Sequence, residues 1–155
     1  MKYILSVLGF FFMSGSALAA QCIAENASYE MATSREARLT LEKRAEPAGY
    51  SDLEITVRAE GNPNRFSFYL TASNGYGNYY AIADDEAVSE SGMIVFFFRQ
   101  QGERLASYED LPASGSPAPD AIFLPMLGSG LWYGTNGTDN PVMIPTEIWY
   151  LTGCK

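Results

Sequence analysis

The chain contains two cysteines, Cys22 and Cys154, and they lie close to its two ends. In an oxidising compartment an isolated pair is usually bonded, so we expect one intramolecular disulfide. A disulfide requires the two Cα atoms to lie within about 7 Å of each other. The first and last segments of the folded chain are therefore predicted to be neighbours, as in a barrel or sandwich whose terminal strands pair.

The start of the chain predicts export to such a compartment. Lys2 gives a positive start, residues 3–13 form an uninterrupted run without charge, and Ala17-Leu18-Ala19 has the small-x-small pattern of a signal peptidase site. We expect a signal peptide over residues 1–19, cleaved after Ala19. Residues 20–155 then form a single β domain, periplasmic or secreted by a bacterium.

Two other interpretations of this start are less favoured. A membrane anchor needs about 20 apolar residues, and this apolar core is shorter. A lipid anchor on Cys22 needs a small residue before the cysteine, where this chain has Gln21. No further long apolar run follows, so the sequence predicts no membrane association after cleavage of the signal.

Alternation of apolar and polar residues predicts strands. Residues 53–60 and 65–72 alternate without a break and are separated by Gly61-Asn62-Pro63-Asn64, which is strong turn chemistry. They are expected to form an antiparallel hairpin. Residues 79–83 predict a short strand, and residues 93–98, apolar on both faces, are expected to form the most buried strand.

The remaining segments are shorter. Residues 104–108, 121–124, 131–133 and 146–151 are each expected to be a strand, and residues 33–45 fit either a strand or a short helix. About eight short strands with regular turns predict an all-β, mainly antiparallel fold. The sequence leaves open a small β-barrel or a β-sandwich, with one short helix near 33–45 as an option.

The charge of the chain restricts its partners. Removal of residues 1–19 takes away Lys2 and lowers the formal net charge from −8 to −9. From residue 66 onward ten acidic residues stand against three basic ones. Nucleic acid and anionic membrane surfaces are disfavoured because both are bound through Lys and Arg. A basic protein is a possible partner, and solubility alone is a simpler explanation of the acidity.

Several catalytic side chains are missing from the sequence. There is no histidine, which argues against Ser-His-Asp and Cys-His sites and against the common zinc sites. Both cysteines are expected to be consumed by the disulfide. No phosphate-binding glycine motif is present, so the sequence predicts no cofactor and no metal ligand set. We expect a protein that is not an enzyme.

Clustered carboxylates leave one catalytic alternative. Asp84-Asp85-Glu86 and Glu109-Asp110 could serve a hydrolase only if two carboxylates faced each other across a cleft, which sequence neighbours on loops rarely do. A calcium site at residues 84–86, or among the oxygens of residues 136–140, is a further alternative, although neither has EF-hand spacing.

Aromatic residues outside the expected core positions form the candidate binding surface. Tyrosine and tryptophan are common anchors of binding surfaces, and they also pack the rims of ordinary cores. The candidate residues lie on predicted strands and turns from residue 69 onward: Tyr69, Tyr76, Tyr79, Tyr80, Trp132 and Tyr133.

Three functions are compatible with these features. The leading hypothesis is an exported, non-catalytic binding protein, for example a protein inhibitor or a surface binder. The second is a lipocalin-like carrier that holds a small apolar ligand inside a barrel. The third is a small hydrolase that works through carboxylates, with Asp84, Asp85, Glu109 and Asp120 as its candidates.

Overall fold

The structure is a computed structural model that describes residues 21–75, 77–84, 88 and 92–155; the expected signal peptide lies outside these residues. The described elements are a 3-10 helix, one α-helix and nine strands. Their bounds are η1 Ala24–Asn26, β1 Ala27–Met31, β2 Ala37–Ala48, β3 Ser51–Ala59, β4 Phe66–Ala72, β5 Tyr79–Ala83, β6 Met93–Gln101, β7 Arg104–Ser107, β8 Ala121–Phe123, α1 Leu127–Thr135 and β9 Ile148–Cys154.

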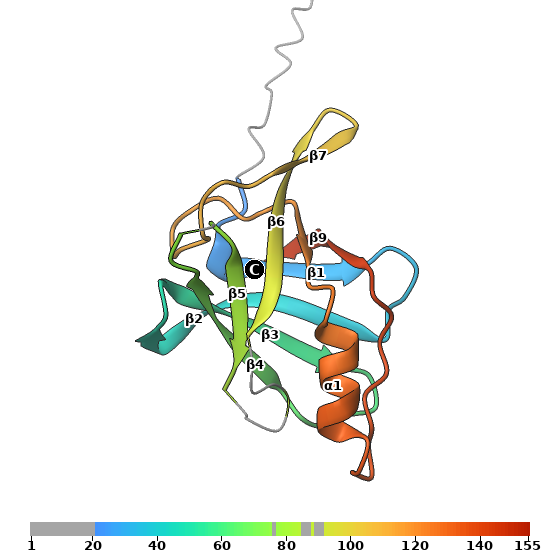
Figure 1. The fold of residues 1–155 in the computed structure, drawn as a ribbon. Coiled ribbons are helices and arrows are strands. Elements are labelled where there is room, and N and C mark those ends of the chain that lie inside the picture. The colour runs from blue at the N-terminus through green and yellow to red at the C-terminus, as the bar shows by residue number, and fades with distance from the viewer. Residues whose placement is uncertain (1–20, 76, 85–87, 89–91) are drawn as a thin grey trace, which may run out of the picture.

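The strands form one antiparallel sheet that closes into a barrel (Figure 1). Going round the barrel, β5, β4, β3, β2, β1, β9, β8 and β6 are neighbours, and pairing of β5 with β6 closes the ring. The ninth strand, β7, pairs with the far half of β6 as a hairpin that projects from the barrel (Figure 1). The expected all-β fold is confirmed. Of the two architectures that the sequence left open, the structure shows the barrel, which is closed by eight strands.

The two ends of the chain meet in this barrel. β1 pairs with β9 from Ala27↔Cys154 to Met31↔Trp149. Beside this pairing a disulfide joins Cys22 to Cys154, whose Cα atoms lie 5.7 Å apart. The predicted bridge between the terminal segments is therefore confirmed.

Alternation along the strands fills the barrel with apolar side chains. The predicted hairpin is β3 and β4, in register from Glu54↔Tyr69 to Val57↔Phe66. Every second residue of these strands points inward, because side chains on a strand alternate between the two faces of the sheet. The largest fully buried side chains of the interior are Trp149, Tyr29, Phe68 and Phe97.

The structure corrects two expectations and decides one choice that the sequence left open. Residues 131–133 are not a strand but belong to α1, which buries Leu127, Leu131 and Thr135 at a spacing of four residues. The open choice over residues 33–45 is decided in favour of a strand, because residues 37–45 lie within β2. The final strand starts two residues later than expected and reaches Cys154.

β6 is not the most buried strand. It alternates like the other strands, and its outward residues Ile94 and Phe96 are 36% and 43% exposed. The most buried strand is β3, in which five consecutive residues from Leu53 to Val57 are buried. The reason is that the arginine side chains of Arg44 and Arg65 cover the outer face of β3, whereas the described residues leave Ile94 and Phe96 on β6 more than a third exposed.

Candidate binding surface

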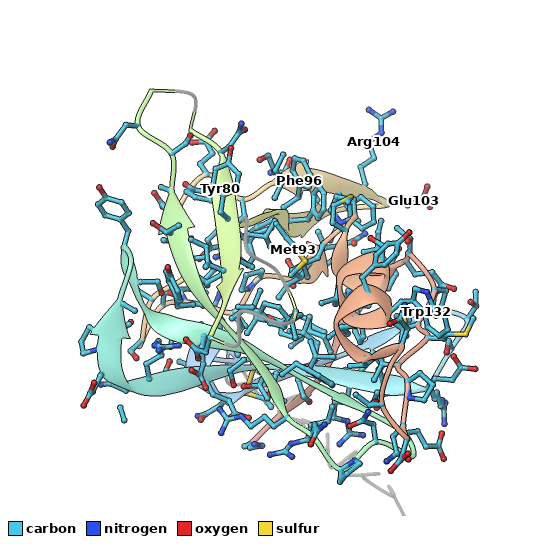
Figure 2. All side chains as sticks on the ribbon, turned by 60° about the horizontal axis from the view of Figure 1, so that its bottom comes forward. Tyr80, Met93, Phe96, Glu103, Arg104 and Trp132 are labelled. Carbon is cyan, nitrogen blue, oxygen red and sulfur yellow. A yellow bond between two sulfur atoms is a disulfide. The ribbon has the colours of Figure 1, made fainter. Side chains whose placement is uncertain are left out.

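The outer surface of the barrel carries a continuous apolar face on β5, β6, β8 and β9. We call it the aromatic face and define it by eight outward residues: Tyr80, Ile82, Ile94, Phe96, Phe98, Phe123, Ile148 and Tyr150. None of these side chains carries a charge at neutral pH. Figure 2 shows Tyr80 and Phe96 on this part of the sheet.

The strand register brings these residues together. Tyr80 lies opposite Ile94 in the pairing of β5 with β6. Phe96 lies opposite Phe123, and Phe123 lies opposite Ile148. The rings of Phe96 and Phe123 stack with their centroids 6.3 Å apart and an interplanar angle of 26°. Cross-strand neighbours of this kind form one surface, since directly opposite Cβ atoms are about 5 Å apart.

The opposite outer face, on β2, β3 and β4, carries charged residues that neutralise one another. Arg44 contacts Glu54 and Asp84, with nitrogen to oxygen distances of 3.0 Å in both pairs. Arg65 contacts Glu54 and, at 3.1 Å, Glu42. The hydrogen bond and charge of Asp84 raise the pKa of Arg44 above its usual value. These charges are paired within the protein, so this network needs no partner.

The aromatic residues predicted for binding are divided among different environments. Tyr80 belongs to the aromatic face, whereas Tyr69 lies under the Arg44 guanidinium, 5.7 Å from its ring centroid. Tyr79 turns the other way: its ring lies 6.1 Å from that of Phe97, and its hydroxyl donates to the Glu109 carbonyl. Burial, together with Asp110 and Glu109, raises the pKa of Tyr79 above its usual value. Tyr76 lies outside the described residues.

Trp132 and Tyr133 lie on α1, and Figure 2 shows Trp132 on this helix. They are 37% and 76% exposed, and Met126 and Met143 nearby in the sequence are 57% and 72% exposed. Residues 121–146, which link the aromatic face to α1 and to β9, contain one charged side chain, Asp139. This stretch therefore adds exposed apolar side chains without adding charge.

Sequence reasoning missed most of the aromatic face, including Ile94, Phe96, Phe123 and Tyr150. The available signal was the run of residues 93–98, apolar on both faces. In an antiparallel sheet with one face in water, such a run leaves half of its apolar side chains at the surface unless something covers them. The pattern alone favours a strand buried on both sides, and the structure shows that this expectation is wrong for Ile94 and Phe96.

Two of the four carboxylates of the hydrolase hypothesis have structural partners. Asp84 is bound to Arg44, and Asp120 accepts a hydrogen bond of 2.8 Å from the backbone nitrogen of Gln100. Glu109 and Asp110 line a surface groove of about 410 Å³ together with Arg99. Asp85 lies outside the described residues. Among the residues that the structure describes, no group of three or more His, Cys, Asp or Glu side chains is placed to hold a metal ion.

Comparison with known proteins identifies no relative from which a function could be inferred. No family model, no curated protein and no solved structure matches this chain. Within the described residues, no helix is both long enough and apolar enough to cross a membrane.

Proposed function

We propose that this chain is an exported, non-catalytic binding protein that docks a basic protein on its aromatic face. The observation that carries the proposal is that Ile94, Phe96 and Tyr150 are each more than a third exposed on a face without charged side chains. Monomeric proteins rarely expose continuous apolar patches of this kind, and such patches mark interaction sites.

The composition of the face suits the centre of an interface. Burying one large apolar side chain contributes roughly 1.5–3 kcal/mol, and interface centres are enriched in aromatic residues and poor in charged ones. The stacked pair Phe96 and Phe123 is held by the strand register, so little side-chain entropy is lost when a partner covers it.

The sign of the surrounding charge favours a basic partner. The strands and loops after residue 92 carry six acidic residues against Arg99, Arg104 and Lys155. Arg99 stacks on the ring of Tyr108, 4.7 Å from its centroid. An acidic field around an apolar face attracts a basic protein and raises its association rate.

Export is supported by two independent features. The sequence of residues 1–19 has the pattern of a signal peptide. The disulfide between Cys22 and Cys154 is stable in the periplasm or outside the cell and is rare in the cytosol.

A carrier of a small apolar ligand is the second candidate. A groove of about 750 Å³ lies beside β4 and the end of β5, and Phe66, Phe68 and Val88 form its apolar side. The barrel interior itself is occupied by Trp149, Tyr29 and Phe97. Native mass spectrometry of the exported protein tests this candidate, because a carrier shows additional bound mass and a surface binder does not.

The main experiment places a photo-cross-linking amino acid at position 96, with position 50 as the control. Tyr50 is 69% exposed at the turn between β2 and β3, away from the aromatic face. Both proteins are expressed in the bacterium that produces the chain, and their adducts are identified by mass spectrometry. We expect an adduct with a basic protein from position 96 alone.

Binding of that basic protein is then measured with purified components. Phe96→Ser should weaken binding about tenfold or more, while Tyr50→Ser should change it less than about twofold. Equal adducts from the two positions, an acidic partner, or unaltered affinity of Phe96→Ser would each overturn the proposal.

A further inference from the structure

A second surface site lies where β9, β1, β2 and β3 run side by side. A groove of about 360 Å³ crosses their outer faces. Its lining contains three basic side chains and one acidic one: Ser28, Arg38, Thr40, Glu42, Arg58, Gly153, Cys154 and Lys155. This local excess of positive charge contrasts with the net charge of the whole chain.

Two of the basic residues face each other directly. Arg38 on β2 lies opposite Arg58 on β3 in the strand register. Like charges in directly opposite positions destabilise a sheet, because their Cβ atoms are only about 5 Å apart. Both arginines also line an adjoining groove of about 480 Å³, together with Arg35, Glu30, Glu36 and Glu60, so the pair lies where the two grooves meet.

Two acidic residues beside the arginine pair, Glu42 and Glu30, are already engaged. Glu42 contacts Arg65 and accepts a hydrogen bond from Thr40. Arg38 makes one contact with Glu30, at 2.8 Å. Within the described part of the chain, no carboxylate lies within 4.0 Å of the Arg58 guanidinium. Arg58 therefore has donors available for a ligand.

The floor of the groove is shaped by a glycine. A Cβ atom at Gly153 would lie 2.6 Å from the hydroxyl oxygen of Ser28, which is closer than real contacts allow. Gly153 pairs with Ser28 beside an irregularity in the pairing of β1 with β9, where Thr152 is the extra residue. Bulges of this kind are frequent next to functional sites.

We propose that this groove binds a single tetrahedral oxyanion, a phosphate or sulfate group, between Arg38 and Arg58. Guanidinium groups match the geometry of such anions with paired N–H donors, and Lys155 and the Ser28 hydroxyl supply further donors. The ligand is a small molecule, since the acidity of the whole protein repels polyanions. The site shares no lining residue with the aromatic face, although β9 contributes to both, and it does not depend on the docking surface.

The experiment titrates ¹⁵N-labelled protein with inorganic phosphate, inorganic sulfate, glycerol phosphate and acetate, with chloride holding the ionic strength constant. We expect saturable amide shifts at Ser28, Thr40 and Gly153 with the tetrahedral anions. Tighter binding of glycerol phosphate than of inorganic phosphate identifies an esterified ligand, and the reverse identifies the free ion. Saturation by acetate with equal affinity would overturn the assignment.

Matched variants connect the binding to the arginine pair. Arg58→Gln should weaken phosphate binding about tenfold and raise the melting temperature of the ligand-free protein, because it removes the repulsion from Arg38. Arg104→Gln, at the exposed hairpin tip, makes the same change in charge elsewhere and should leave both quantities unaltered. If both substitutions weakened phosphate binding equally, the binding would reflect nonspecific electrostatic attraction, and the proposed site would be refuted.

Gly153→Ala tests the groove without changing the charge. It should weaken phosphate binding as well, because the added methyl group occupies the space beside Ser28. Retention of full affinity by a folded Gly153→Ala protein would show that the anion does not bind in this groove.

Discussion

At the scale of single residues, alternation gives sequence neighbours opposite roles. Phe96 is 43% exposed on the aromatic face, and Phe97 is 2% exposed in the core, where it packs near Tyr79. On the far side of the barrel Glu54 occupies an outward position and is nevertheless buried, because Arg44 and Arg65 cover it. Position on a strand decides the direction of a side chain, and its neighbours decide its exposure.

Tyr29 gives the protein a specific sensitivity to high pH. Its buried hydroxyl donates a hydrogen bond of 3.0 Å to the Pro119 carbonyl. Burial, with smaller effects of Asp120 and Tyr108, raises the pKa of Tyr29 well above its ordinary value of 10.0. The folded state therefore holds this proton more tightly than the unfolded state. The resulting stability is fully present below pH 10 and is lost as the pH rises further.

We expect Tyr29→Phe to cost about 1 kcal/mol at pH 8 through the lost hydrogen bond, and to lose less stability than the wild type between pH 8 and pH 11. Urea unfolding at the two pH values measures both effects. Tyr133→Phe is the matched control, because Tyr133 is 76% exposed and should keep the wild-type pH dependence. An unchanged pH dependence in Tyr29→Phe would contradict the assignment.

At the scale of elements, α1 depends on a side chain that links it to the segment leading to β9. The Thr135 hydroxyl donates to the Leu131 carbonyl at 2.7 Å and accepts from the backbone nitrogen of Val142 at 2.8 Å. Thr135 is 4% exposed, so neither partner can turn to water when the hydroxyl is removed. This hydroxyl holds the end of the helix against the returning chain.

Thr135→Val should destabilise the protein by about 1–3 kcal/mol, because it leaves the buried Val142 N–H without an acceptor. Thr135→Ser keeps the hydroxyl and should cost less. Urea unfolding gives the free energies, and hydrogen exchange at the Val142 amide should accelerate in Thr135→Val alone. Equal stability of the two variants would show that the hydroxyl contributes nothing.

The elements that the sequence predicted well are those with long patterns. β3 and β4 alternate over seven or more residues around a clear turn, so both strands and their pairing could be anticipated. Residues 131–133 are too few to distinguish the period of a strand from that of a helix, and α1 was missed. The aromatic face could not be located either, because the exposure of β6 depends on which elements cover the closed barrel.

At the scale of the whole molecule, the barrel has two chemically different sides. The charges around Arg44 and Arg65 are paired within the protein, whereas the aromatic face offers apolar side chains without charge. Closure of the ring leaves β7 as the strand outside it, on a projecting hairpin (Figure 1). A rigid frame of this kind presents both sides in a fixed orientation.

The disulfide should stabilise this frame without determining its topology. It joins residues 132 positions apart, and removal of such a bridge typically costs about 2–5 kcal/mol. The pairing of β1 with β9 consists of backbone contacts from Ala27 to Met31 and does not require the sulfur atoms. We expect the double variant Cys22→Ala, Cys154→Ala to keep a β-type circular dichroism spectrum and to unfold at lower urea concentration.

Reductant provides the control for this prediction. It should lower the urea midpoint of the wild type to that of the double variant and leave the double variant unchanged. A double variant that loses its β spectrum in the absence of urea would show that strand pairing alone cannot hold the barrel closed.

The pairing of the first strand with the last also determines when the fold can be completed. During synthesis β1 emerges long before β9, so the sheet has two unpaired edges until residues 148–154 are available. Such edges can pair with other chains and start aggregation, and contacts between distant segments form slowly. A newly made chain can therefore aggregate through these edges during almost the whole of its synthesis. The risk ends when β9 pairs with β1.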